Sequence, residues 1–218
     1  MNIVVGGGKY GCYAIEYLKE KKEDFVVLDM DPNCLAVQRF KLKTFEHASP
    51  EGEYFMIGDL REVLELLTTL KPKNVFPTAP VHVAADLAKI RFKLLPWSEA
   101  IENLLPKLPE AVVLQAGKEK LVVSFNKGYE CIDKCVMPKT CPTSGTTKPC
   151  TMTELMQFAC PEAFILVSYS MAPGMGALKG SELLGFFKWA NLRDKFVVAT
   201  ACDCHGVFSA FAKSGNVE

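Results

Sequence analysis

The sequence predicts an α/β protein, with a parallel sheet that carries helices on both faces followed by an α/β C-terminal half that carries a Cys-rich loop. Two observations predict this class. Up to about residue 91, short apolar runs alternate with amphipathic stretches, which is the pattern of β-α-β units. A glycine-rich turn directly follows the first apolar run. We expect two parts, residues 1–95 and 96–218.

The N-terminal elements follow from the spacing of the apolar residues. Short apolar runs predict strands, and longer stretches with a helical period predict helices between them. The expected strands are residues 2–6, 25–29, 54–57 and 74–77, and the expected helices are residues 10–22, 33–42, 60–70 and 81–92. Asp59 and Glu62 precede the third helix at the spacing of a capping box.

The C-terminal part is less regular. Prolines between residues 96 and 109 mark a boundary. The expected elements are a hairpin of residues 111–115 and 121–125, helices 153–158 and 181–191, and strands 163–168 and 196–200. Residues 174–180 are rich in glycine and are expected to connect a strand to a helix, although they could also cradle a phosphate.

Charge and hydropathy exclude several classes of protein. Lys plus Arg and Asp plus Glu both number 25, so a nucleic-acid partner is not expected. The first residues run directly into a strand without a charged leader or a cleavage site. The longest uncharged stretch, residues 163–178, contains Pro and Gly and is shorter than the roughly 20 residues of a membrane span. We therefore expect a soluble, cytoplasmic protein with no membrane span.

A G-x-G-x-x-G fingerprint stands between the first strand and the first helix. It consists of Gly6, Gly7, Gly8, Lys9, Tyr10 and Gly11. In such a turn the first glycine lets the strand turn, the second lets the backbone approach a pyrophosphate, and the third lets the helix pack closely. The helix N-terminus then stabilises the phosphate charge. The fingerprint predicts a Rossmann-like domain that binds an adenine dinucleotide.

Two carboxylates refine this prediction. Asp29 ends the second strand, near the position about 20 residues past the fingerprint where a carboxylate bonds the ribose 2′-hydroxyl. Because that carboxylate repels a 2′-phosphate, we expect NAD(H) rather than NADP(H). Asp59 stands at a helix start, where an Asp usually caps the helix, but it could also contact the adenine.

The first ninety or so residues resemble a known family. The matching stretches are residues 3–11 (IVVGGGKYG), residues 26–32 (VVLDMDP) and the Gly58-Asp59 step. They resemble the nucleotide-binding domains of Trk/RCK-type potassium-transport regulators. The resemblance implies that Gly6, Gly8 and Gly11 hold the pyrophosphate, that Asp29 holds the ribose and that Asp59 lies near the adenosine. The rest of the chain does not resemble that family's ligand-sensing domain.

Thr78 and His82 are the candidate catalytic residues. They follow the fourth strand, where its loop meets the crevice at the carboxyl ends of the strands. His82 could donate a proton to a carbonyl, with Thr78 as a second polar contact. A structural interpretation stands beside this one, since Pro80 suits the first turn of a helix and His82 could simply lie on that turn.

The nine cysteines need an explanation in a reducing compartment. Cys131, Cys135, Cys141 and Cys150 fall in an irregular loop, residues 129–151, which a metal centre could order. Cys-Pro steps and uneven spacing favour an iron–sulfur cluster. Zinc is an alternative, completed from afar by residues 202–205, and so are ordinary thiols without a metal.

These features predict an NAD(H)-binding protein that is a redox enzyme or a redox-sensing subunit. Because a nicotinamide gives up two electrons as a hydride and a simple cluster accepts one, a cluster would be structural, sensory, or coupled to an external partner. The alternative is a non-catalytic NAD-sensing module related to the transport regulators. The expected partners are the dinucleotide, an electron-transfer protein or a transporter, and a second copy of the chain.

Overall fold

The structure, a computed structural model, describes residues 1–45 and 51–214. The chain forms two compact units. Unit 1 comprises Met1–Arg91 and Met175–Gly185, and unit 2 comprises Phe92–Gly174 and Phe186–Glu218. Unit 1 is therefore discontinuous, whereas the sequence suggested one boundary after residue 95.

Unit 1 is built on a sheet whose central strands are parallel. Its strands lie in the order β11-β5-β1-β2-β4-β3. They are β1 (Asn2–Val5), β2 (Phe25–Asp29), β3 (Lys43–Thr44), β4 (Glu53–Ile57), β5 (Asn74–Pro77) and β11 (Met175–Lys179). β11 alone among them runs antiparallel, against β5. Ile3, Val26 and Val75 pair across the three central strands and are fully buried, as expected for strands covered on both faces.

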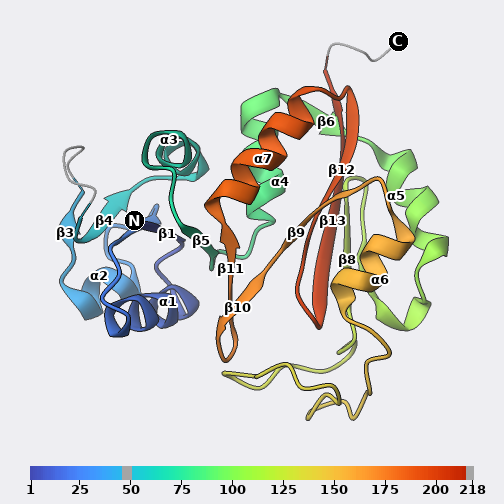
Figure 1. The fold of residues 1–218 in the computed structure, drawn as a ribbon, viewed down its shortest axis with the longest axis horizontal. Coiled ribbons are helices and arrows are strands. Elements are labelled where there is room, and N and C mark those ends of the chain that lie inside the picture. The colour runs from blue at the N-terminus through green and yellow to red at the C-terminus, as the bar shows by residue number, and fades with distance from the viewer. Residues whose placement is uncertain (46–50, 215–218) are drawn as a thin grey trace. The chain divides into compact units, whose positions relative to one another are not determined.

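Four helices belong to unit 1. They are α1 (Lys9–Glu20), α2 (Leu35–Phe40), α3 (Leu60–Leu70) and α4 (Val83–Phe92). Figure 1 shows α1 and α2 on one face of the sheet and α3 on the other. The α/β fold class is confirmed. α2 begins later than predicted because the Asp31 carboxylate accepts from the Asn33 amide at 2.8 Å and holds that residue in a turn.

Unit 2 contains a second, mostly antiparallel sheet. Its strands lie in the order β7-β8-β13-β12-β9, and β6 also pairs with β13. The strands of this unit are β6 (Leu94–Pro96), β7 (Val113–Ala116), β8 (Lys120–Ser124), β9 (Phe164–Val167), β10 (Tyr169–Ala172), β12 (Lys195–Ala201) and β13 (His205–Lys213). The expected hairpin is confirmed as β7 and β8, whereas β13 was not predicted.

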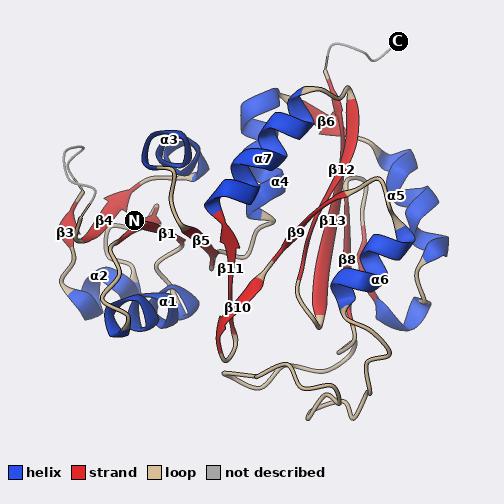
Figure 2. Cartoon of the chain, viewed as in Figure 1, coloured by secondary structure: helices blue, strands red, loops and turns tan. Residues whose placement is uncertain are grey.

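Helices cover both faces of this sheet (Figure 2). The helical segments are α5 (Ser98–Leu104), η1 (Leu105–Lys107), η2 (Glu110–Val112), α6 (Met152–Ala159) and α7 (Gly180–Asn191), whose first half belongs to unit 1. On one face, Ile101 of α5 and Met156 of α6 join the same buried cluster as Phe208 of β13. On the other, Phe186 of α7 packs against Phe196 of β12, with ring centroids 5.9 Å apart.

The Cys-rich segment, residues 126–151, contains neither helix nor strand and is held by two buried polar side chains. Asn126 donates to the Tyr129 carbonyl and to the Cys131 sulfur, each at 3.3 Å, and accepts from the Cys141 thiol at 3.3 Å. The Lys148 ammonium donates to the Met137 carbonyl at 3.0 Å. Hydrogen bonds therefore supply some of the order that the apolar content cannot.

No helix in the described ranges has the length and apolar character needed to cross a bilayer.

The start of α7 generates a test of the fold of unit 1. A Cβ added to Gly180 would lie 1.9 Å from the Pro72 carbonyl oxygen, whereas one added to Gly185 on the same helix would meet open space. We expect Gly180→Ala to lower the free energy of unfolding of unit 1 by about 1–3 kcal/mol. Gly185→Ala, the matched control, should leave it unchanged or raise it by up to about 1 kcal/mol. Urea unfolding followed by circular dichroism measures both, and equal effects would contradict the packing of this helix start.

Asn126 generates a second test. Asn126→Ala removes three hydrogen bonds from a buried position. We therefore expect the free energy of local unfolding of residues 126–151 to fall by roughly 1–3 kcal/mol. Residues 126–151 should exchange their amide hydrogens faster and become more sensitive to protease, while β12 and β13 stay protected. Asn103→Ala, at an exposed position, is the control. Unchanged exchange in the Asn126 variant would mean that other contacts order the segment.

Candidate functional site

The turn between β1 and α1 is built by close backbone contacts. Gly6 has a φ of +105°, which favours glycine. A Cβ on Gly11 would lie 2.1 Å from the Gly6 carbonyl oxygen, so a side chain at residue 11 would push the helix off the strand. Gly8 caps α1, and a Cβ there would meet nothing within 4 Å. The turn is therefore packed tightly behind Gly11 and open in front of Gly8.

Asp29 is fixed beside this turn. It ends β2, and one carboxylate oxygen accepts from the Gly7 amide at 2.6 Å while the other accepts from the Asp31 amide at 2.9 Å. A carboxylate offers about four lone-pair positions, so acceptor capacity remains for a ligand hydroxyl. Met30 follows Asp29, so no cation stands next to it in the chain.

A cavity of about 490 Å³ opens beside Asp29, at the carboxyl ends of the parallel strands. Gly6, Asp29, Gly58 and Ala79 line it, and each of them ends or closely follows β1, β2, β4 or β5. β1 lies between β2 and β5, so the direction in which successive strands are added across the sheet reverses at β1. Open α/β sheets bind their ligands in this kind of crevice.

Apolar side chains line the rest of the cavity. Met30, Val81 and Ile90 belong to its walls and are 75%, 42% and 40% exposed. Sequence reasoning did not select them, because isolated apolar residues that follow a strand or lie on a helix carry no motif. Their shared property is exposure beside a crevice, which suits the flat face of a ligand ring.

Asp59 caps α3 and also lines the cavity. Its carboxylate accepts from the Arg61 amide at 2.6 Å, and its own amide donates to Glu62 at 2.6 Å, so the predicted capping box is confirmed. The Arg61 guanidinium lies 4.0 Å from the Asp59 carboxylate. The rim therefore carries one cation that is already close to a carboxylate.

The structure places the remaining predicted residues of unit 1 outside the cavity lining. The Thr78 hydroxyl lies 2.9 Å from the carbonyl oxygens of both Val5 and Gly6, so it holds the turn. His82 is buried, with 5% of its surface exposed, and does not line the cavity. The catalytic roles of Thr78 and His82 stay predictions. Lys9 and Tyr10 lie together at the start of α1, with the ammonium 5.8 Å from the ring centroid.

In unit 2, His205 of β13 reaches the Cys-rich segment. Its Nε2 lies 3.3 Å from the Cys131 sulfur, and its Nδ1 lies 2.8 Å from the Ser124 hydroxyl. Burial lowers the pKa of the His205 imidazole. The sequence suggested that residues 202–205 could complete a zinc site from afar, and the pairing of β13 with β8 brings His205 to one of the four cysteines, Cys131.

The four predicted metal ligands have different surroundings. Cys131 and Cys141 both bond Asn126, and the Cys135 sulfur accepts from the Met137 amide at 3.3 Å. Cys150 packs against the apolar core of unit 2. Among the residues that the structure describes, no three His, Cys, Asp or Glu side chains converge as a metal site would require. The iron–sulfur or zinc centre stays a prediction.

The thiols also differ in acidity. Hydrogen bonds from the side chain and backbone of Ser144 lower the pKa of the Cys141 thiol to about 6. Burial raises the pKa of the Cys160 thiol to about 12, and burial likewise raises the pKa of Cys204 despite the Lys148 ammonium 3.1 Å from its sulfur. Loop and core cysteines therefore have different chemistry.

Comparison with known proteins identifies the family and corrects one expectation. The model AF_1314_N, described as "Uncharacterized protein, N-terminal domain", matches residues 1–83, and AF_1314_C, described as "Uncharacterized protein, C-terminal domain", matches residues 83–214. A protein of Archaeoglobus fulgidus described as "Uncharacterized protein" is 43% identical over 216 residues, which cover 98% of this chain and 100% of that protein. No solved structure matches the chain.

The resemblance to Trk/RCK-type potassium-transport regulators is therefore wrong. The resemblance was based on residues 3–11, which form a tight strand-to-helix turn, and on residues 26–32, which contain an acidic strand end. Unrelated families share such a local geometry, because any backbone that approaches a phosphate closely needs glycine there. Both models and the archaeal relative agree over nearly the whole length, and the chain belongs to the AF_1314 family.

Proposed function

We propose that unit 1 binds an adenine dinucleotide, with NAD(H) preferred over NADP(H). The observation that carries the proposal is the position of the Asp29 carboxylate, fixed by the Gly7 amide at 2.6 Å on the wall of the cavity. A carboxylate at the end of the second strand is placed to accept from the ribose hydroxyls of a nucleotide whose phosphates lie on the glycine turn.

The glycine turn supports the phosphate end of this arrangement. The space in front of Gly8 is open, and the first backbone amides of α1 follow directly after it. An anion in this space would meet those amides and the positive end of the helix dipole. The apolar walls at Met30 and Ile90 would lie against the adenine.

The preference for NAD(H) follows from charge. A 2′-phosphate beside Asp29 would meet a carboxylate, with no Arg or Lys directly after it in the chain to compensate. Arg61 is the cation on the rim, and it already lies near Asp59. The repulsion at Asp29 should therefore decide between the two cofactors.

A redox role for the bound dinucleotide is the second part of the proposal. The chain carries nine cysteines, and the lowered pKa of Cys141 supports thiol chemistry in unit 2. The alternative is a module that senses NAD(H) without turnover. Oxidation of NADH by the anaerobic protein when an artificial electron acceptor is added supports a redox enzyme, whereas tight binding without oxidation supports the sensor.

Calorimetric titration with NADH and NADPH tests the role of Asp29. We expect NADH to bind the unaltered protein at least about tenfold more tightly, which corresponds to about 1.4 kcal/mol. Asp29→Ala should narrow the difference to within about threefold, because it removes both the hydroxyl acceptor and the repulsion. Glu65→Ala, an exposed carboxylate of the same unit, should leave the difference unchanged. Equal affinities for the unaltered protein would remove the assignment.

Gly8→Val tests the phosphate position. The valine side chain would project into open space, so the protein should still fold. It would occupy the volume that the pyrophosphate needs, so we expect dinucleotide affinity to fall by about 100-fold or more. Gly185→Val, at another open glycine of unit 1, is the matched control and should bind normally. Circular dichroism checks that both variants are folded. Retained binding in a folded Gly8→Val protein would place the ligand elsewhere.

A further inference from the structure

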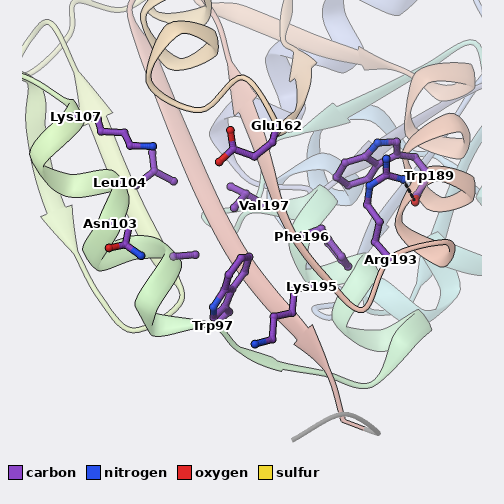
Figure 3. A pocket seen from close by; sticks show the side chains of 11 residues that line it. Trp97, Asn103, Leu104, Lys107, Glu162, Trp189, Arg193, Lys195, Phe196 and Val197 are labelled. Carbon is purple, nitrogen blue, oxygen red and sulfur yellow. Dashed lines mark hydrogen bonds between the residues drawn. The ribbon is translucent and has the colours of Figure 1, made fainter.

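Unit 2 contains a cavity of its own, which the proposed function does not use. It has a volume of about 520 Å³, in the range of sites for small organic ligands. Its walls come from α5 and η1, from the end of α7 with the loop behind it, and from the first residues of β12. Figure 3 shows Trp97, Asn103 and Lys107 on one side, Trp189 and Arg193 on the other, and Val197 between them.

Both tryptophans of the chain line this cavity. Trp97 precedes α5, and Trp189 lies near the end of α7. Leu104 and Phe196 complete an apolar wall between the helices and the sheet. Indole rings bury a large flat surface with little loss of side-chain freedom, so they favour ligands that are themselves flat.

Cations outnumber anions around the cavity. Lys107, Arg193 and Lys195 line it, and within the described part of the chain none of them forms an ion pair. Arg193 is held in place, because its guanidinium stacks 4.1 Å from the Trp189 ring centroid and donates to the Trp189 carbonyl at 3.0 Å. Since a guanidinium has five N–H donors, others remain for a ligand.

One carboxylate, Glu162, also lines the cavity. Together with burial, this carboxylate raises the pKa of the neighbouring Cys160 thiol, which is itself buried. The lining therefore has three cationic side chains and one carboxylate, and its net charge is positive.

The Trp97 indole also has an unsatisfied polar atom. Its Nε1 is buried and, within the described residues, has no hydrogen-bond partner. A buried donor without an acceptor is costly, and native proteins rarely keep one without a reason. An acceptor oxygen on a ligand would satisfy it if the indole turned to present this atom to the cavity.

We propose that this cavity binds a small organic anion that carries a flat aromatic ring. The ring packs against the indoles and Phe196, and the acid group lies among Arg193, Lys195 and Lys107. A carboxylate and a phosphate share this chemistry, since each offers oxygens to a guanidinium and an ammonium. The proposal is independent of dinucleotide binding in unit 1.

Four small probes test the proposal on the full-length protein. Benzoate and phenyl phosphate carry both features, benzamide carries the ring alone, and acetate carries the charge alone. Calorimetry measures affinity, and tryptophan fluorescence reports the cavity because both tryptophans lie in its wall. We expect at least one aromatic anion to change the fluorescence and to bind about tenfold or more tightly than benzamide and acetate. The stronger of the two aromatic anions identifies the acid group.

Variants locate the binding. Arg193→Gln and Lys195→Gln should each lower the affinity for the aromatic anion by about fivefold to tenfold, since each removes a charged hydrogen-bond donor. Trp97→Phe keeps a ring but loses the N–H, and we expect a smaller decrease in affinity, of about threefold. The fluorescence of Trp189, the remaining tryptophan, measures binding to this variant. Lys118→Gln, an exposed cation outside the cavity, is the matched control and should not change affinity.

Three outcomes would overturn the proposal. The first is that neither aromatic anion binds. The second is that benzamide or acetate binds as tightly, which would remove the requirement for both ring and charge. The third is that Lys118→Gln weakens binding as much as Arg193→Gln, which would indicate general attraction of anions to the surface.

Discussion

The contact between the Gly11 backbone and the Gly6 carbonyl oxygen sets the geometry of unit 1. Residue 11 has no Cβ, and a Cβ there would lie only 2.1 Å from that oxygen. Glycine therefore allows the first turn of α1 to pack directly against the end of β1. This closeness lets the Gly7 amide reach the Asp29 carboxylate on the neighbouring strand. The Thr78 hydroxyl then joins the same turn to β5 through the Val5 and Gly6 carbonyls. Three strand ends are thereby held around one cavity, and its polar groups are positioned before any ligand arrives.

Much of unit 1 could be predicted from sequence because its signals are local. β2, β5 and α3 have the predicted bounds, since each is a regular apolar pattern flanked by turn or capping residues. β11 was missed because residues 175–179 contain small residues and glycine and look like a turn, and its strand form depends on pairing with β5. β13 was missed because residues 202–205 were interpreted as metal ligands, although residues 206–212 are mostly apolar.

In the candidate site, too, the residues that carry a local sequence signal could be predicted and the others could not. Gly6, Asp29 and Asp59 follow the ends of parallel strands, so their gathering at one edge of the sheet could be predicted. The apolar wall at Ile90 could not, because it depends on residues far apart in the chain. The role of Asn126 could not either, because its bonds lie within an irregular segment that carries no motif. The aromatic cavity of unit 2 carries no motif at all, and it exists because α5, α7 and β12 approach one another in space.

The discontinuity of unit 1 affects how the chain is made. β11 covers one edge of β5, yet it is encoded after the whole first segment of unit 2. During synthesis the first 91 residues leave the ribosome with that edge of β5 open, and an open strand edge can pair with other molecules. The edge closes only when residues 175–179 emerge. The family-model boundary at residue 83 is therefore not a place where the nascent chain can complete a fold, and a fragment that ends there would lack β11, which pairs with β5.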